Sequence, residues 1–440
     1  MTWSEHVIWW QLHPLSFLGA PAQALPAGAA PQHRLGALEP WLDYLVELGC
    51  NGLALGPVFA AQSHGYDTVD HFAIDPRLGT DDDFDALVAA CRRRGVRLLL
   101  DGVFNHVGRG FAAFQDVLRY GRESAHAGWF RVDFDAPPET AGTDGFGYAD
   151  FEGHHDLVAL NHDEPAVADH VAAVMDHWLR RGADGWRLDA AYAVPPAFWR
   201  AVLPRVRAAH PGAWFVGEVI HGDYPRFVAE GGLDSVTQYE LWKAIWSSLN
   251  DRNFFELSWA LTRHCDLAAD FDPLTFVGNH DVTRIVSRLD DERHLAHALV
   301  VLFTVAGVPS VYAGDEQAFR GVKYDRVDGD AEIRPAFPDT PAGLAPDGRS
   351  VLRLHQDLIG LRRRHPWLLR ARPKVVHLDN EVLAYQVGGA GDGLLVLLNV
   401  GDRPFTLAGA PGSLLHLMGS GDGPAEHVEP HGWAVLQLRG

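Results

Sequence analysis

The 440-residue sequence predicts an α/β fold, a (β/α)8 barrel with a short inserted subdomain after the third strand and a C-terminal all-β sandwich domain. Three observations support this prediction. Short apolar runs alternate with amphipathic helical stretches, which is typical of a parallel sheet covered by helices. Eight such units fit into about 360 residues with one interruption. After them, the apolar pattern changes to a period of two, which is typical of antiparallel strands.

The eight predicted barrel strands are short and apolar. They lie at residues 6–12, 51–55, 96–101, 183–188, 214–216, 235–237, 274–277 and 309–312. Helix signals separate them, because Thr80 is predicted to cap a helix that ends near Gly95, and Pro165 to begin one that ends at Gly182. A doubly wound open sheet is the structural alternative, but no glycine-rich phosphate loop follows the first strand.

Two segments depart from the barrel pattern. Residues 107–156 mix Gly, Asp, Phe and His without a sustained period, so we expect an inserted domain there. The barrel is then formed by residues 1–106 and 157–370. Residues 371–440 contain strand-like runs between Gly- and Pro-rich turns, and they form the predicted C-terminal β domain.

Composition excludes several kinds of partner. The formal net charge of −20 at pH 7 argues against nucleic acid and anionic membranes. No apolar run is long enough for a transmembrane helix, and the N-terminus lacks the pattern of a signal peptide, so we expect a cytoplasmic protein. The cysteines, Cys50, Cys91 and Cys265, are odd in number and widely spaced, which favours free thiols over a disulfide or a metal site.

Acidic residues stand at the ends of four predicted strands, at Asp101, Asp189, Glu218 and Asp281. In a parallel barrel the C-terminal strand ends meet at one mouth, so we expect these carboxylates to lie together. Any one of them alone could simply cap the following helix. The set of four, with Arg187 two residues before Asp189, favours an active site.

Two carboxylates can hydrolyse a glycosidic bond if one is an ionised nucleophile and the other is a proton donor with a raised pKa. Arg187 lies one strand period before Asp189, so both side chains point the same way, and its charge is expected to keep Asp189 ionised. Glu218 has the apolar neighbours Val216 and Val219, which favour its protonated form.

Four motifs lie at the C-terminal ends of the third, fourth, fifth and seventh predicted strands, DGVFNH at 101–106, GWRLDA at 185–190, GEV at 217–219 and FVGNHD at 276–281. Together they resemble the four conserved regions of the α-amylase family, glycoside hydrolase family 13. The resemblance implies a retaining mechanism through a covalent glycosyl-enzyme, with Asp189 as nucleophile and Glu218 as acid/base. Asp281 would bind sugar hydroxyls and stabilise the oxocarbenium-like ring, and the same subsite would be lined by Arg187, His106 and His280.

Two further segments carry the resemblance. His64–Asp67 resembles the family's Gly-Tyr-Asp segment, which implies that the Tyr66 ring stacks on the reacting sugar. Arg334 precedes a proline in the long loop after the last predicted strand. Similarity to a related branch of the family implies that Arg334 pairs with Asp67, and that both bind the non-reducing end of the substrate.

Other features resemble the neopullulanase/cyclomaltodextrinase branch. Leu157–Asn161 ends like the fifth conserved region of that branch, and the Lys-His pair of typical α-amylases is absent after Asp189. The branch usually carries an N-terminal β domain, which we expect to be absent because the predicted barrel starts near residue 6. The pattern resembles enzymes that open small cyclic or linear gluco-oligosaccharides, among them the cyclic maltosyl-maltose hydrolases.

The sequence therefore predicts a retaining hydrolase of short or cyclic α-1,4 (and α-1,6) gluco-oligosaccharides, such as cyclic maltosyl-maltose, cyclodextrins or maltooligosaccharides. A transglycosylase or isomerase with the same intermediate is the alternative, since the outcome depends on whether water or a sugar hydroxyl attacks. A non-catalytic sugar-binding relative is disfavoured because the three carboxylates Asp189, Glu218 and Asp281 are intact.

The expected partner is a small-molecule oligosaccharide, bound by a monomer or a homodimer. No cofactor is predicted to be required. Many family members bind calcium through Asp and Asn in the loop after the first strand, whereas residues 14–38 contain no Asp, Asn or Glu. Asn105 is the remaining candidate ligand for a calcium ion.

Overall fold

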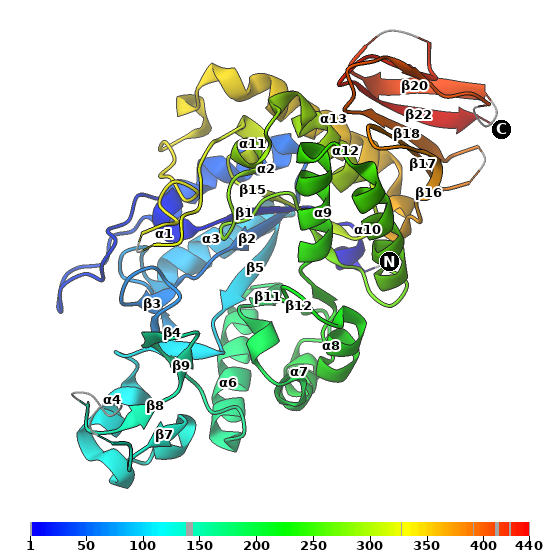
Figure 1. The fold of residues 1–440 in the computed structure, drawn as a ribbon. Coiled ribbons are helices and arrows are strands. Elements are labelled where there is room, and N and C mark those ends of the chain that lie inside the picture. The colour runs from blue at the N-terminus through cyan, green and yellow to red at the C-terminus, as the bar shows by residue number, and fades with distance from the viewer. Residues whose placement is uncertain are drawn as a thin grey trace.

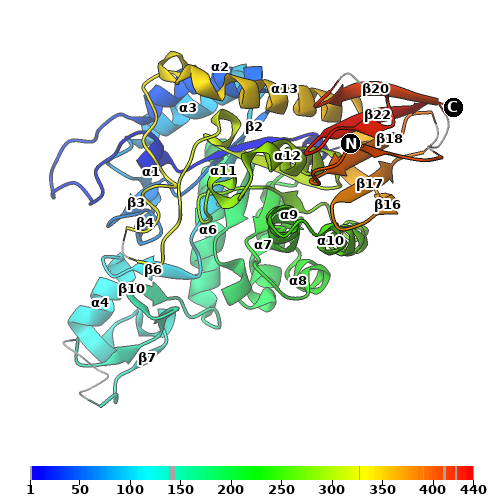
Figure 2. The ribbon, with the colours of Figure 1, turned by 45° about the horizontal axis from the view of Figure 1, so that its top comes forward.

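The computed structural model describes residues 2–137, 144–326, 328–389, 391–409, 413–421 and 424–439. Residues 138–143, in the middle of the predicted inserted domain, lie outside the described residues. Figures 1 and 2 show a central barrel with a small unit projecting from one side and an antiparallel sheet packed at another.

Eight parallel strands form the predicted barrel. They are β1 (Trp9–Leu12), β2 (Gly52–Leu55), β5 (Arg97–Gly102), β11 (Gly185–Leu188), β12 (Trp214–Gly217), β13 (Ser235–Val236), β14 (Leu274–Thr275) and β15 (Val308–Tyr312). Their order in the sheet is β13-β12-β11-β5-β2-β1-β15-β14. A parallel bridge between Thr237 and Leu274 joins the two ends, so the sheet closes and the open-sheet alternative is excluded.

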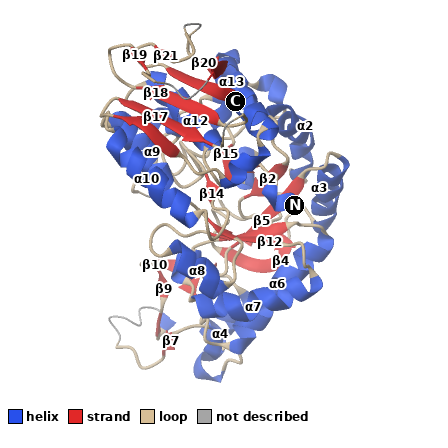
Figure 3. Ribbon diagram, turned by 90° about the vertical axis from the view of Figure 1, so that its right-hand side faces the viewer, coloured by secondary structure: helices blue, strands red, loops and turns tan. Residues whose placement is uncertain are grey.

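Helices surround these strands on the outside (Figure 3). They are α1 (Pro14–Phe17), α2 (Glu39–Leu48), α3 (Asp81–Arg93), α6 (Pro165–Arg181), α7 (Pro196–Ala209), α8 (Tyr224–Gly231), α9 (Tyr239–Asn250), α10 (Phe254–Leu267), α11 (Ile285–Arg288), α12 (Leu295–Thr304) and α13 (Arg349–Arg364). Among the described residues, no helix has the length and apolar character needed to cross a membrane.

The predicted helix ends are confirmed. Thr80 and Asp83 form a reciprocal capping box at the start of α3. Pro165 is the first residue of α6, and Gly182 ends it in a left-handed conformation with φ 117°. These local signals fix where each helix begins and ends, and therefore how the strands are spaced.

Alternate residues of the barrel strands fill two different cores. Trp9 and Val216 belong to a cluster inside the barrel, where Trp9 stacks on Trp214 with ring centroids 5.7 Å apart. The neighbouring Trp10 instead packs outside the sheet against Trp41 of α2. Because side chains alternate along a strand, every second residue of each barrel strand points to the barrel axis. The inward-pointing residues near the strand starts are apolar and fill the inside of the barrel.

The segment after β5 forms a small unit of short strands and a helix, with a hairpin of the barrel beside it. The unit contains β6 (His106–Gly108), α4 (Ala112–Tyr120), β7 (Val132–Asp133), β8 (Gly147–Tyr148), β9 (Asp150–Phe151) and β10 (His154–Ala159), and the hairpin consists of β3 (Phe59–Ala61) and β4 (Thr68–Ile74). Strands β6, β10 and β9 pair in one sheet, and β7 pairs with β8. Figure 2 shows this unit at the side of the barrel away from the C-terminal sheet.

The C-terminal part is antiparallel, as predicted. A five-stranded sheet has the order β16-β17-β18-β22-β20, from β16 (Lys374–Leu378), β17 (Val382–Val387), β18 (Leu394–Asn399), β20 (Ser413–Gly419) and β22 (Trp433–Arg439). A second pair joins β19 (Phe405–Thr406) to β21 (His427–Val428). Along β18, Val396 belongs to the large core shared with the barrel, whereas Leu395 and Leu397 face the small core under β19 and β21.

Candidate active site

The predicted carboxylates converge on one guanidinium group, that of Arg187 on β11. Its Nη1 lies 2.7 Å from Asp101 Oδ2 and 3.0 Å from Asp189 Oδ1. Its Nη2 lies 2.9 Å from Glu218 Oε1 and 3.7 Å from Asp281 Oδ2. The Arg187 side chain is 8% exposed, and Asp101, Asp189 and Glu218 are also buried, whereas Asp281 is partly exposed at the mouth of the barrel.

Strand register explains this convergence. On the paired strands β5 and β11, Arg187 lies directly opposite Asp101. On β11 and β12 it lies opposite Val216, which points into the barrel, and Glu218 follows two residues later on the same face. The inward layer is therefore apolar at the strand starts and charged at the C-terminal ends.

Besides Arg187, two groups hold the Glu218 carboxyl. Its Oε2 accepts a hydrogen bond of 2.9 Å from the Ala190 amide, and its Oε1 accepts one of 3.2 Å from the Tyr239 hydroxyl. Tyr239 in turn accepts a 2.9 Å bond from the side-chain amide of Asn279. Ala190 has φ 43°, an uncommon left-handed conformation for a residue with a Cβ. Such backbone strain is frequent at functional sites, and here it accompanies an amide that points at Glu218.

Burial dominates the ionisation of the two central carboxyls. It raises the pKa of Glu218, against the opposing charge of Arg187, as the apolar neighbours predicted. It also raises the pKa of Asp189 to about 7, although Arg187 opposes this shift. Arg187 favours the ionised form of Asp189, as expected, but burial outweighs it, so the pKa of Asp189 is raised and not lowered. One guanidinium is shared among several acids, and the nearby Asp101 carboxylate itself raises the pKa of Asp189.

Asp281 differs from these two acids. Its burial would raise its pKa, but His280, Arg334 and Arg187 together hold the pKa well below its ordinary value. His280 Nε2 lies 3.0 Å from Asp281 Oδ2, and Arg334 Nη2 lies 2.8 Å from Oδ1. Asp281 is therefore the acid of the site that stays ionised over the widest pH range.

Tyr66 and His280 form one face of the site. Their rings are parallel, with centroids 5.7 Å apart, and the Tyr66 hydroxyl is hydrogen-bonded to His280 Nε2. The same hydroxyl donates to Asp101 Oδ2 over 3.3 Å. Gln11 Nε2 donates to His280 Nδ1 over 3.1 Å, which leaves the ring proton on Nε2, toward Asp281 and Tyr66. His13 stacks against both rings, at 6.2 and 6.3 Å.

His106 lies behind this face. Its Nε2 contacts the Tyr66 carbonyl oxygen at 3.1 Å, and its Nδ1 lies 3.1 Å from the side-chain amide nitrogen, Nδ2, of Asn105. Its ring stacks on Phe151 with centroids 4.7 Å apart. Both ring nitrogens of His106 thus have protein partners, and the residue holds the Tyr66 loop in place.

Arg334 has partners other than the predicted one. Its Nη2 contacts Asp281 and Asp330, at 2.8 and 2.7 Å, and its Nε donates to the His280 carbonyl oxygen over 2.8 Å. Asp67 accepts a 2.6 Å bond from the Ser63 hydroxyl, and its Oδ1 is buried without a hydrogen-bond partner in the described part of the chain. The expected pairing of Arg334 with Asp67 is therefore not formed, because two other acids already neutralise the guanidinium.

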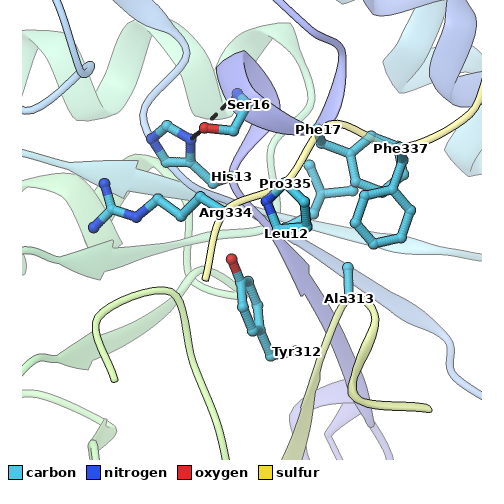
Figure 4. A pocket seen from close by; sticks show the side chains of 9 residues that line it. All are labelled: Leu12, His13, Ser16, Phe17, Tyr312, Ala313, Arg334, Pro335 and Phe337. Carbon is cyan, nitrogen blue, oxygen red and sulfur yellow. Dashed lines mark hydrogen bonds between the residues drawn. The ribbon is translucent and has the colours of Figure 1, made fainter. Parts of the chain in front are cut away.

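Packing of the loop after β15 explains the position of Arg334. Figure 4 shows its side chain extending beside His13, while Pro335 and Phe337 lie on the other side of the loop, toward Phe17. The rings of Phe337 and Phe17 are stacked, with centroids 4.2 Å apart. This aromatic contact anchors the loop and directs the guanidinium toward Asp281.

Sequence reasoning missed several contacts of the site. Tyr239 follows the sixth barrel strand by three residues, a position that could have indicated a site residue. Tyr192 donates to Glu152 Oε1 over 2.8 Å and so links the loop after β11 to the small unit between β6 and β10. This contact joins segments that are far apart in the sequence, and no local pattern marks it.

The chain belongs to the α-amylase family, and within it to the cyclomaltodextrinase/neopullulanase branch. The family described as "Alpha amylase, catalytic domain" matches residues 35–370. The protein is therefore a glycoside hydrolase of this family, as the four motifs predicted.

Two curated relatives show the level of similarity. The maltogenic alpha-amylase of Bacillus acidopullulyticus is 29% identical over 429 residues, which are 90% of this chain and 70% of the relative. Neopullulanase 2 of Thermoactinomyces vulgaris is 30% identical over 405 residues, 87% of this chain and 67% of the relative.

A solved structure matches the whole chain. The ligand-free cyclic alpha-maltosyl-(1→6)-maltose hydrolase of Arthrobacter globiformis has a TM-score of 0.82 at 28% identity and covers 100% of both chains. That enzyme has also been solved in complex with cyclic alpha-maltosyl-(1→6)-maltose and in complex with maltose.

Proposed function

We propose that the protein is a retaining hydrolase of short or cyclic α-linked gluco-oligosaccharides that works through a covalent glycosyl-enzyme. One observation carries the proposal. Adjacent nitrogens of the Arg187 guanidinium hold Asp189 at 3.0 Å and Glu218 at 2.9 Å. One guanidinium therefore holds both carboxyl groups that a glycosidase needs, and a retaining enzyme uses such a pair as nucleophile and acid/base about 5–5.5 Å apart.

In the proposed reaction, the Asp189 carboxylate attacks the anomeric carbon while the Glu218 carboxylic acid gives its proton to the leaving glycosidic oxygen. The Glu218 carboxylate then takes a proton from water, and the resulting hydroxide attacks the anomeric carbon and releases Asp189. The raised pKa of Glu218 suits the proton donor of the first step.

Asp281 and its neighbours are proposed to stabilise positive charge on the sugar ring. Asp281 keeps its negative charge because His280, Arg334 and Arg187 lower its pKa despite burial. A fixed anion next to a developing oxocarbenium ion lowers the barrier without reorganisation. Tyr66, His106, Asp67 and Arg334 are proposed to bind the substrate or to hold the groups that do.

The substrate class rests on the relatives and on one local difference. The structure that covers the whole chain is a hydrolase of cyclic maltosyl-maltose. The Lys-His pair of typical α-amylases is absent after Asp189, and Tyr192 of that loop is instead bound to Glu152. We therefore propose cyclic maltosyl-maltose, cyclodextrins and maltooligosaccharides as candidate substrates, rather than starch.

A product time course tests the proposal, with cyclic maltosyl-maltose, cyclodextrins, panose, pullulan and starch offered separately. We expect the small substrates to be opened faster than starch, and the first product to carry the α-anomeric configuration in proton NMR. A first product with the β configuration would exclude retention. Longer or rearranged sugars as the main products would identify a transglycosylase instead.

A further inference from the structure

A cluster of metal-ligating side chains lies outside the active site, where the barrel meets the C-terminal sheet. Asp291, His294 and His431 each offer one ligand atom, and these atoms lie within 4.8 Å of one another. Asp291 caps the short 3₁₀ helix Glu292–His294 that leads into α12. His431 belongs to the turn between β21 and β22. Figure 3 shows α12 beside the C-terminal sheet.

The distances fit a small divalent ion. His294 Nε2 and His431 Nδ1 are 3.0 Å apart, and His431 Nδ1 is 3.9 Å from Asp291 Oδ2. Ligand atoms about 2.1 Å from a tetrahedral zinc ion are roughly 3.4 Å from one another. The two contacts of His431 therefore differ from this spacing by about half an ångström each, and the ligand atoms of Asp291 and His294 lie within 4.8 Å of each other.

The surroundings of His431 match those of a ligating histidine. Its other ring nitrogen, Nε2, lies 2.9 Å from Asp402 Oδ1. A proton on Nε2 directed at this carboxylate leaves a lone pair on Nδ1, which faces His294 and Asp291. A carboxylate partner of this kind is the usual outer contact of a metal-binding histidine, where it fixes the tautomer and the ring orientation.

The charge and burial of the cluster also suit a cation. His294 is 3% exposed, so a cation bound there would be shielded from solvent on that side. Arg293 contacts Asp291 Oδ2 at 2.6 Å, so a bound ion would share this oxygen with the guanidinium, and Arg252 is paired with Asp402 and Glu381 at 3.1 and 3.6 Å. The three acids and two arginines leave negative charge in excess around the two histidines.

From this geometry we propose that Asp291, His294 and His431 bind a divalent transition-metal ion of the zinc type, which ties the C-terminal sheet to the barrel. Two nitrogen ligands and one carboxylate oxygen favour zinc over calcium or magnesium, which prefer oxygen. Water would complete the coordination. Because two of the ligands come from the barrel side and the third from the C-terminal part, the ion would bind the folded chain and stabilise it.

The test uses the full-length, chelator-treated protein and zinc chloride as the probe. Isothermal titration is expected to show one tight zinc ion per chain, with calcium and magnesium giving no comparable binding. Saturating zinc is expected to raise the melting temperature by several degrees. Cobalt(II) in place of zinc is expected to give the visible absorption of a tetrahedral nitrogen- and oxygen-bound ion.

Variants locate the ion. His294→Gln and His431→Gln each remove a ligand and are expected to abolish the tight binding. Asp402→Asn removes only the outer partner of His431 and is expected to weaken zinc binding by about 10–100-fold. The matched control is His126→Gln, which alters a histidine that pairs with Asp116 at 3.0 Å on another part of the molecule and is expected to leave zinc binding unchanged.

Two results would overturn the proposal. One is the absence of tight zinc binding by the folded wild-type chain. The other is binding by His431→Gln and Asp402→Asn with wild-type affinity, which would show that surface histidines hold the ion. Circular dichroism and the melting temperature without zinc show whether each variant is folded. Asp402 is exposed, so Asp402→Asn keeps the test valid if a histidine variant does not fold.

Discussion

At the scale of single residues, the site depends on how one buried cation is divided among several acids. Arg187 contacts Asp101, Asp189 and Glu218 within 3.0 Å. Burial raises the pKa values of Asp189 and Glu218, whereas neighbouring cations lower that of Asp281 despite its burial. Burial and neighbouring charges thus shift Asp281 in the opposite direction from Asp189 and Glu218 around one guanidinium.

The pKa of Asp189 predicts the acidic side of the pH profile. A nucleophile must be ionised, and burial raises the pKa of Asp189 to about 7. As the pH falls below that value the carboxyl takes up a proton, so kcat/KM is expected to fall about tenfold per pH unit. The measurement is kcat/KM on a small α-glucan between about pH 5 and pH 9. A flat profile down to pH 5 would contradict this assignment.

A second prediction concerns Tyr239, which donates to Glu218 over 3.2 Å. Tyr239→Phe removes a donor to the ionised form of Glu218, so the pKa of Glu218 is expected to rise and the alkaline limb of the pH profile to move upward. We expect kcat to fall about tenfold, because the carboxyl is less firmly oriented. Tyr224→Phe is the matched control, since the buried Tyr224 hydroxyl donates to the Ile220 carbonyl instead. Equal effects of both substitutions would show a purely structural role.

The ionisation of the site also marks a limit of sequence reasoning. The motifs correctly predicted that the four acids and Arg187 lie together in one site. The sequence spacing of Arg187 and Asp189 suggested a simple ion pair. The actual ionisation follows from the sum of burial and of charges on four strands and loops, which no local pattern contains.

At the scale of elements, helix ends and strand order could be predicted because their signals are local. Thr80, Pro165 and Gly182 lie where capping chemistry requires them. The hairpin of β3 and β4 and the strand β16 were missed, because their residues lack a clear apolar alternation and their pairing depends on neighbouring segments. The loop that carries Arg334 was also predicted only as a loop, since the Phe337–Phe17 contact that directs it is long-range.

Gly182 allows a test at this scale. It ends α6 with φ 117°, and a Cβ there would lie 2.5 Å from Val88 Cγ1. Gly182→Ala is therefore expected to lower the free energy of unfolding by about 2–4 kcal/mol, from backbone strain plus steric overlap. Gly95→Ala is the control, because Gly95 has φ 68° but open space around it, and its cost should be about 1 kcal/mol. Urea denaturation of both variants measures the difference, and equal costs would show that α3 and α6 pack less tightly here than the structure indicates.

At the scale of the whole molecule, the C-terminal sheet shares its core with the barrel. Tyr385 of β17 is fully buried, and its hydroxyl lies 2.6 Å from Thr304 Oγ1 at the end of α12. Val396 of β18 belongs to the same apolar cluster as Phe303. The predicted division into residues 1–106 with 157–370, 107–156 and 371–440 remains a prediction about domains, and this shared core indicates that the first and last unfold together.

Calorimetry tests that expectation. We expect one unfolding transition for the barrel and the C-terminal sheet, and Tyr385→Ala should lower its midpoint by removing about 3–5 kcal/mol of stability. Zinc should be absent from this measurement, so that the metal site proposed above does not affect the result. Two transitions, of which only one moves in the Tyr385→Ala variant, would show that the sheet is an independent unit.

The central claim is that Asp189 forms the covalent glycosyl-enzyme, and mass spectrometry tests it most directly. Glu218→Gln removes the acid/base, so an α-glucosyl fluoride, which leaves without protonation, should glycosylate the enzyme and leave the adduct unhydrolysed. The account predicts a mass increase of one glucosyl unit, located by peptide mapping to Asp189. An adduct on Asp101 or Asp281 would contradict the account, as would the absence of any adduct in a variant that still releases fluoride.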